Sequence, residues 1–283
     1  MSKTNKINTL TIITLKICLF VFMIAITLLC FPVVFVCFFI YPINKKICLQ
    51  IITFAGTLHW QIESIFFNLT ADVSFKGLEK IKSDRNYIIC SNHLGTMDYF
   101  LIHELARKKG NLNFLKYLLK DSLFWIPILG QGMYIGGFCF LSRNFIKDKI
   151  KIKNWVNLFK KSSLPIWPII YPEGTRITPQ KKALADEFCR KNNYPIMEYT
   201  LFPRKKGFDI IKKEFRGYAD EVLSLTLFFN GKKVPTLFDI FLGNQCLGEF
   251  KVIVDVYKND ENCDVVEIFK NINKNLSEIK KNK

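Results

Sequence analysis

An uncharged apolar run near the start of the chain constrains its fold more than any other feature. Residues Ile17 to Tyr41 read ICLFVFMIAITLLCFPVVFVCFFIY, 25 residues without a charged side chain. As an α-helix this run would be about 37 Å long, enough to cross a bilayer core of about 30 Å. It is too long for the apolar part of a secretory signal peptide, and no A-x-A-like cleavage site follows it. We therefore expect this segment to enter a membrane.

The path of the membrane segment stays open. Pro32 lies in mid-run and predicts a kink, so a re-entrant hairpin is an alternative to a straight span. Nearly equal numbers of lysines flank the run, so the positive-inside rule does not choose an orientation. The next segment, Ile47 to Leu69, has one acidic residue and a strongly apolar face. It predicts a helix at the membrane interface, or equally a buried helix of the following domain. We expect residues 1–69 to form an N-terminal membrane anchor and residues 70–283 one further domain.

After residue 70, short β-rich runs alternate with helical patterns. The strands expected are Asp72–Phe75, Asn86–Cys90, Asn113–Leu118, Ile135–Leu141, Ile166–Tyr171, Glu198–Phe202, Val222–Phe228 and Lys251–Val256. The helices expected are 97–109, 121–132, 144–161, 179–192, 205–216 and 264–281. This alternation predicts an α/β fold, a layered sheet with flanking helices, preceded by the membrane helix and the amphipathic helix.

The charge and the cysteines limit the classes of partner. The chain holds 41 Lys and Arg against 24 Asp and Glu, and the excess lies almost wholly after residue 43. Such a balance predicts an anionic partner: nucleic acid, an anionic membrane surface or a phosphorylated substrate. No basic-aromatic stacking motif supports nucleic acid. Nine cysteines without a C-x-x-C pair or a Cys/His cluster at zinc spacing predict reduced thiols and no metal site.

The first motif with chemical content lies between residues Asn86 and Phe100, where an apolar strand runs into a polar turn and then a helix. On one helix His93 and Asp98 would point about 140° apart, so they meet only if a turn separates them. With Asp98 in the first helical turn, its carboxylate can accept the Nδ1 proton of His93 and leave Nε2 free as a base. The alternative is a structural pair that ties a loop to a helix.

The second motif is Tyr171-Pro-Glu-Gly-Thr-Arg176, directly after an apolar strand. Gly174 allows close approach of a ligand, Thr175 supplies a hydroxyl, and Arg176 supplies a planar fork suited to phosphate. The motif therefore predicts an anion-binding loop. A strand-end turn with a surface salt bridge between Glu173 and Arg176 is the alternative.

Two weaker motifs complete a series: a strand that ends in Phe-Leu-Ser-Arg143 and a strand followed by Pro203-Arg-Lys-Lys-Gly-Phe208. In this order the four resemble the sequence blocks of the glycerolipid acyltransferase family, best known for the 1-acylglycerol-3-phosphate (lysophosphatidic acid) acyltransferases. The resemblance is closest to the eukaryotic branch that includes lysophosphatidylinositol and lysocardiolipin acyltransferases, where N-H-x-x-x-x-D, F-L-x-R, E-G-T-R and P-R-x-x-G-F recur. It covers roughly residues 60 to 257.

The resemblance implies a role for each matched residue. It makes His93 the general base, Asp98 its orienting partner, Arg143 and Arg176 phosphate ligands, Glu173, Gly174 and Thr175 the acceptor-binding loop, and Pro203 a shaper of the acyl-donor side. The chain departs from the family at Gly95, where a serine is often found, and it lacks the hydrophobic C-terminal spans of many relatives. The second departure would make the N-terminal segment the main anchor.

The expected function is that of an acyl-CoA-dependent O-acyltransferase of phospholipid biosynthesis or remodelling. Its acceptor would be a lysophospholipid, first of all lysophosphatidic acid, with lysophosphatidylinositol or another lysophospholipid as the alternative. Acyl-CoA is expected as co-substrate, with no metal or tightly bound cofactor, and an anionic bilayer as partner. Family analogy places it at the endoplasmic reticulum membrane. A membrane-anchored interaction protein that lost catalysis is the alternative of another class.

Overall fold

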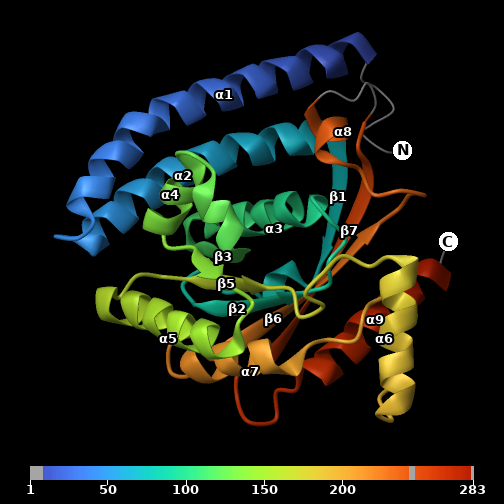
Figure 1. The fold of residues 1–283 in the computed structure, drawn as a ribbon. Helices are drawn as coiled ribbons and strands as arrows, with labels where there is room; N and C mark the ends of the chain where they lie inside the picture. Colours follow the sequence, from blue (N-terminus) through green and yellow to red (C-terminus); the bar gives the residue numbers. More distant parts are fainter. Residues whose placement is uncertain (1–8, 242–245, 282–283) are drawn as a thin grey trace.

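A mixed sheet forms the centre of the chain in this computed structural model, which describes residues 9–241 and 246–281 (Figure 1). Within those residues the sheet has seven strands: β1 (Ala71–Lys76), β2 (Tyr87–Ser91), β3 (Leu115–Lys120), β4 (Cys139–Leu141), β5 (Trp167–Ile170), β6 (Glu221–Phe229) and β7 (Gly248–Lys258). Their order is β1-β7-β6-β2-β5-β3-β4, and β6 and β7 are antiparallel while the other neighbours are parallel.

Helices cover both faces of the sheet (Figure 1). On one face lie α2 (Lys45–Thr70) and α3 (Met97–Lys108), and on the other lie α5 (Phe145–Ser162), α7 (Lys205–Glu214) and α9 (Val265–Lys281). The remaining helices are η2 (Leu78–Lys80), η3 (Leu112–Phe114), η4 (Asp121–Trp125), α4 (Leu129–Ile135), α6 (Pro179–Lys191) and α8 (Leu237–Phe241). The α/β layered fold predicted from the alternation of strands and helices is thus confirmed.

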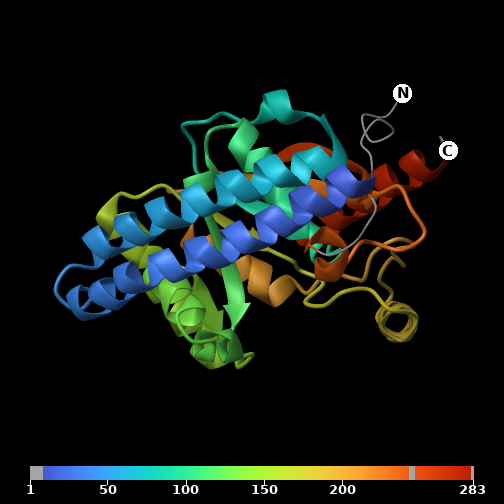
Figure 2. The ribbon, with the colours of Figure 1, turned by 90° about the horizontal axis from the view of Figure 1, so that it is seen from above.

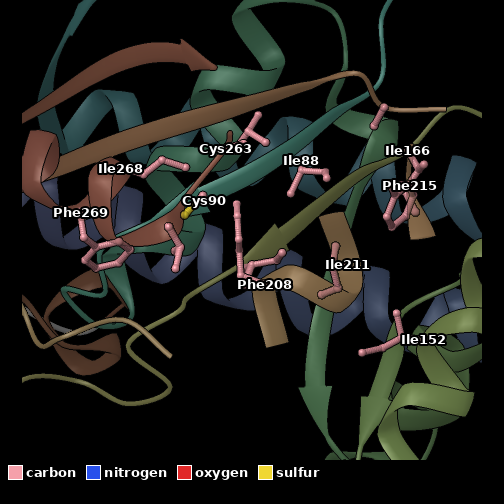
Figure 3. Close-up of a cluster of buried hydrophobic side chains, with 14 of the residues drawn as sticks. Ile88, Cys90, Ile152, Ile166, Phe208, Ile211, Phe215, Cys263, Ile268 and Phe269 are labelled. Carbon is pink, nitrogen blue, oxygen red and sulfur yellow. The ribbon is translucent and has the colours of Figure 1, made fainter. Parts of the chain in front are cut away.

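The strands bury both faces because parallel strands lie between two helical layers. All five residues of β2 are buried, and the first four, Tyr87 to Cys90, alternate between the two cores. Ile89 packs in the core beneath α3, whereas Ile88 packs with residues of α7 and α9. Figure 3 shows this second core, with Phe208 and Phe269 among its labelled members. Two cores, one on each face, fix the register of the central strands.

The first helix, α1 (Thr9–Ile40), is long and apolar enough to cross a membrane and continues through Pro32. It turns at residues 41–44 and lies antiparallel beside α2 (Figures 1 and 2). Cys37 of α1, Cys48 of α2 and Ile135 of α4 form a small buried cluster between them. The apolar helix is therefore packed along the body of the protein.

Helix α2 combines the two alternatives that the sequence leaves open. In its first half Ile51 and Phe54 are exposed, as expected at a membrane interface, whereas Phe67 in its last turn is buried against the ring of Phe250. Helix α2 ends at Thr70 and β1 begins at Ala71, where the two units were expected to divide. That residues 1–69 act as a membrane anchor stays a prediction.

The strand expected over Glu198–Phe202 is wrong. This segment is irregular, because its backbone donors go to side chains rather than to a neighbouring strand. The N–H of Tyr199 donates to Oδ1 of Asn273, and the N–H of Leu201 donates to Oε2 of Glu173. The alternation of apolar and polar side chains in this segment is therefore not accompanied by strand pairing.

A second correction concerns the connection between β3 and β4. The single helix expected over 121–132 is divided into η4 and α4 around Pro127. Ile126 has the extended conformation that a following proline imposes, so the first helix ends before it. Helix α4 then continues to Ile135, and the strand expected from that residue begins at Cys139.

Candidate active site

Three of the four sequence motifs meet because they follow parallel strands of one sheet, and the fourth joins them through a backbone hydrogen bond from the N–H of Arg204 to the carbonyl of Pro172 at 2.9 Å. Strands β2, β5, β3 and β4 are neighbours in that order, so their carboxyl ends lie at one edge of the sheet, where α/β proteins bind ligands. His93 follows β2, Glu173 follows β5 and Arg143 follows β4. A pocket of ≈ 1050 Å³ opens at this edge.

Six of the eight predicted site residues line this pocket: His93, Arg143, Glu173, Gly174, Thr175 and Pro203. Asp98 lies behind His93 and is buried. Arg176 is exposed and lies beside the loop that follows His93. A methyl group added at Gly95 of that loop would be 3.8 Å from Nε of Arg176. The structure therefore gathers the predicted residues at one place, with Arg176 at the edge of the pocket.

His93 and Asp98 form a close pair across the turn predicted to separate them. Nδ1 of His93 lies 2.5 Å from Oδ2 of Asp98, which is in the first turn of α3. The backbone N–H groups of Leu94 and Gly95 donate to Oδ1 of the same carboxylate at 3.1 and 3.2 Å. Thr96, which directly precedes α3, makes no side-chain capping bond.

The carboxylate of Asp98 controls the histidine ring. Burial raises the pKa of Asp98 above its ordinary value, while the bonds from His93, Gly95 and Leu94 limit the rise. When Nδ1 carries the proton, it donates to Asp98, and Nε2 is left as the free acceptor of the ring. This is the arrangement of a general base with an orienting carboxylate.

His93 is also held by groups that the sequence did not connect with it. Its ring stacks on Tyr171 with 4.7 Å between centroids, and its backbone N–H donates to Oε1 of Glu173 at 2.9 Å. The preceding Asn92 exchanges two hydrogen bonds with the backbone of Leu227, at 2.8 and 3.0 Å. Backbone, ring and neighbouring side chain are thus all fixed, as a catalytic base requires.

Glu173 ties three motifs together. Its side chain is 3% exposed, and its two oxygens accept from the N–H groups of His93 and Leu201 at 2.9 and 3.1 Å. Burial raises the pKa of Glu173 to about 7, although the two N–H donors oppose the rise. Both oxygens face inward, so the surface salt bridge with Arg176 considered as an alternative does not form. Glu173 thus holds the backbone of His93 in place.

The loops that carry the arginines depend on unusual backbone conformations. Arg143 has φ 62°, a region that costs about 1–3 kcal/mol for a side chain of this kind and occurs mostly at functional sites. The N–H and the hydroxyl of Ser142 both donate to Oδ1 of Asp148 at 2.8 Å and hold this turn. Gly174 has φ 67°, and a methyl group there would lie 3.2 Å from Cζ of Arg204. Glycine thus accommodates both the positive φ and the close approach of the Arg204 side chain.

Sequence reasoning missed several residues that line the pocket, including Lys120, Tyr171, Lys181 and Arg204. Two had a signal, because Tyr171 opens the second motif and Arg204 follows Pro203. Lys181 had none: it comes from α6, and its Nζ donates to the hydroxyl of Thr175 at 2.5 Å. These cations surround a pocket whose wall is largely apolar, with Leu118 and Ile169 among its residues. Such a pocket suits a ligand with an anionic group and a long apolar chain.

The side chains just before His93 do not offer a nucleophile. Cys90 and Ser91 are both fully buried within β2. Burial raises the pKa of Cys90 well above its ordinary value, and the hydroxyl of Ser91 donates within the sheet to Leu225. His93 is therefore the reactive group that this part of the chain presents to the pocket.

Comparison with known proteins gives concordant matches. The family model described as Acyltransferase matches residues 72–217, more than half of the chain. The 1-acyl-sn-glycerol-3-phosphate acyltransferase 3 of Arabidopsis thaliana is 28% identical over 157 residues, 55% of this chain and 42% of that protein. The 1-acyl-sn-glycerol-3-phosphate acyltransferase gamma of Homo sapiens is 29% identical over 158 residues, 56% of this chain and 42% of that protein. The chain thus aligns with less than half the length of these relatives.

Among solved structures, the crystal structure of the 1-acyl-sn-glycerophosphate (LPA) acyltransferase PlsC from Thermotoga maritima is similar to this chain. The TM-score is 0.50 at 18% sequence identity, and the match covers 93% of this chain and 98% of that one. At this identity the likeness concerns the fold alone.

Proposed function

Because the chain belongs to the glycerolipid acyltransferase family, we propose that it transfers an acyl group from acyl-CoA to the free hydroxyl of a lysophospholipid. The proposed acceptor is 1-acyl-sn-glycerol 3-phosphate and the product is phosphatidic acid. The observation that carries the proposal is the His93–Asp98 pair at the mouth of an apolar pocket rimmed by cations. The printed names of the relatives support the choice of acceptor.

The proposed reaction is a direct transfer. Nε2 of His93 takes the proton of the acceptor hydroxyl while its oxygen attacks the thioester carbonyl. Asp98 stabilises the ring as it becomes positively charged. When the tetrahedral intermediate collapses, the carbon–sulfur bond breaks and the imidazolium returns its proton to the leaving thiolate. The products are the ester and free coenzyme A, and neither a covalent enzyme intermediate nor a metal or bound cofactor takes part.

The cations at the pocket supply recognition of the phosphate in this proposal. Arg143 lines the pocket, and Arg176 lies exposed beside Gly95 on the His93 loop. A guanidinium binds two phosphate oxygens at once, which orients the acceptor as well as attracting it. The apolar part of the pocket would hold acyl chain, with Pro203 on its wall.

The N-terminal helices supply the proposed membrane attachment. Many large apolar side chains of α1 are exposed, including Leu29, Phe35 and Phe39. Since α1 and α2 form an antiparallel pair that packs on the domain, we favour a hairpin inserted from one side over a straight span. The endoplasmic reticulum membrane is proposed as the location by family analogy.

The test is an assay of the purified full-length protein in detergent micelles with labelled acyl-CoA and a panel of lysophospholipids. We expect transfer to 1-acyl-sn-glycerol 3-phosphate to be fastest, and His93→Ala to abolish it. His59→Ala is the matched control, because His59 lies on α2, pairs with Glu63 and does not line the pocket.

Three outcomes would change the proposal. Fastest transfer to lysophosphatidylinositol would replace the acceptor and keep the chemistry. Turnover by His93→Ala close to that of the unmodified protein would remove the catalytic assignment. An unmodified protein that binds acyl-CoA but transfers to no member of the panel would favour the interaction protein.

A further inference from the structure

Several segments outside the N-terminal hairpin expose large apolar side chains, and two of them, η4 with α4 and the start of α5, lie close together. Trp125 in η4 is 77% exposed and Leu129 in α4 is 51% exposed. In the first two turns of α5, Ile146 is 74% and Ile150 is 59% exposed. A surface that gathers such side chains among polar residues is characteristic of an interaction site.

Both segments begin at the pocket. Lys120, the last residue of β3, lines the pocket, and η4 begins at the next residue. Arg143 also lines it, and α5 begins two residues later. The two segments lie side by side, because Nζ of Lys151 bonds both carboxylate oxygens of Asp121 at 3.0 and 2.9 Å. They therefore flank the pocket mouth together.

The surface is continuous with the apolar helix α1. The ring of Tyr134 in α4 lies 5.6 Å from that of Tyr41, just after the end of α1. A methyl group added at Gly132 would lie 3.2 Å from a methyl of Val34. Helix α4 thus packs on the last turns of α1, and it also contacts η4, where the ring of Phe124 lies 5.7 Å from that of Tyr134.

Basic side chains alternate with the apolar ones in α5. Lys147, Lys149 and Lys153 are exposed between and after Ile146 and Ile150. Apolar residues interleaved with lysines are the composition that binds the interface of a bilayer with anionic lipids.

We propose that these segments dock the domain on an anionic bilayer and hold the pocket mouth against the lipid headgroups. The docking surface consists of Trp125, Leu129, Ile146 and Ile150 with Lys147 and Lys149. It acts in addition to the hairpin of α1 and α2, and it does not depend on which reaction the pocket performs. Its consequence is that a lipid substrate can pass between the bilayer and the pocket without crossing water.

The emission of Trp125 tests this contact. The full-length protein is reconstituted into vesicles of phosphatidylcholine and phosphatidylserine, with or without bromine atoms on the acyl chains. The signal of Trp125 is the difference between the unmodified protein and Trp125→Phe. We expect brominated lipid to quench most of this signal, whereas acrylamide in the water should not. Trp155 is the matched control, measured through Trp155→Phe, because it is buried and bonded to Gly137.

A pair of charge variants tests the role of the lysines. Lys147→Glu with Lys149→Glu should reduce quenching of Trp125 by brominated lipid in vesicles with phosphatidylserine and have less effect in phosphatidylcholine alone. Lys270→Glu with Lys274→Glu makes the same charge change on α9, which covers the same face of the sheet as α5 but carries no residue of the docking surface, and should leave the quenching unchanged.

Two results would overturn the docking. Quenching of Trp125 by acrylamide but not by brominated lipid would show that the surface faces water. Protection from both quenchers would show that protein covers it, as in contact with a second copy of the chain. Neither result depends on catalytic activity, so the docking and the proposed reaction are tested independently of each other.

Discussion

The buried carboxyl group of Glu173 should make the stability of the protein depend on pH in an unusual direction. Burial raises its pKa from the ordinary value of 4.5 to about 7 in the folded protein. Between these two values the folded state holds a proton that the unfolded state has released. The free energy of unfolding should therefore fall as the pH rises through this window, because the unfolded state binds fewer protons.

The size of the effect follows from the shift. One pKa unit corresponds to about 1.4 kcal/mol, so Glu173 should lower the free energy of unfolding by about 3 kcal/mol between pH 4.5 and 7. Glu173→Gln cannot ionise and should lack this contribution. The difference in stability between the unmodified protein and the variant should thus shrink, and can change sign, as the pH rises.

The measurement is denaturant unfolding of the full-length protein in detergent micelles, followed by tryptophan fluorescence at several pH values across the window. Taking the difference from Glu173→Gln removes the contributions of the other titrating groups. Glu187→Gln is the matched control, because it makes the same substitution at an exposed position of α6, beside Lys191.

Two results would refute the reasoning. A difference that does not change with pH would mean that Glu173 titrates alike in the folded and unfolded states. If the unmodified protein instead became more stable than the variant as the pH rises, the hydrogen bonds from the N–H groups of His93 and Leu201 would lower the pKa of Glu173 by more than burial raises it. The carboxylate would then be stabilised in the folded state.

The remaining predictions concern the reaction and the anchor. Asp98→Asn should lower single-turnover rates by about two to four orders of magnitude while circular dichroism stays unchanged, because the ring loses its orientation; a rate near normal would contradict the pairing. Arg143→Ala and Arg176→Lys should raise KM for the lysophospholipid more than they lower kcat, and unchanged KM values would show that the two arginines do not bind the acceptor. Removing residues 1–43 should move the protein from carbonate-resistant pellets to a salt-extractable fraction and lower its stability, since α1 covers Ile135. Continued carbonate resistance would show that α2 is inserted as well.

The sequence predicted the parts of the site that follow directly from strands. Apolar runs located β2 and β5, and motifs after parallel strands necessarily converge at one edge of the sheet. The turn between His93 and Asp98 was predictable for a similar reason, because the pair cannot meet on one helix. The structure places the two side chains 2.5 Å apart.

The inward orientation of Glu173 was not predictable from the motif. Its two carboxylate oxygens accept hydrogen bonds from the backbone N–H groups of His93 and Leu201, which are 80 and 28 positions away in the sequence. The same contact explains the failed strand assignment over Glu198–Phe202. A local pattern reports the alternation of side chains, but it carries no information about which distant group takes the backbone hydrogen bonds.

The neighbour of strand β1 has a consequence for how the protein is made. Helix α2 runs into β1 without a loop, yet β1 pairs with β7, so Ala71 finds its partner in Gly248. During synthesis the hairpin emerges before the sheet, and the strand attached to it has no partner until β7, which begins at Gly248, has left the ribosome. Insertion of the hairpin into the bilayer can therefore precede closure of the sheet, and the domain that contains the sheet would complete its folding while already attached to the membrane. Nascent chains that end before Gly248 should accordingly be membrane-bound but cleaved by protease near β1, whereas longer chains should resist.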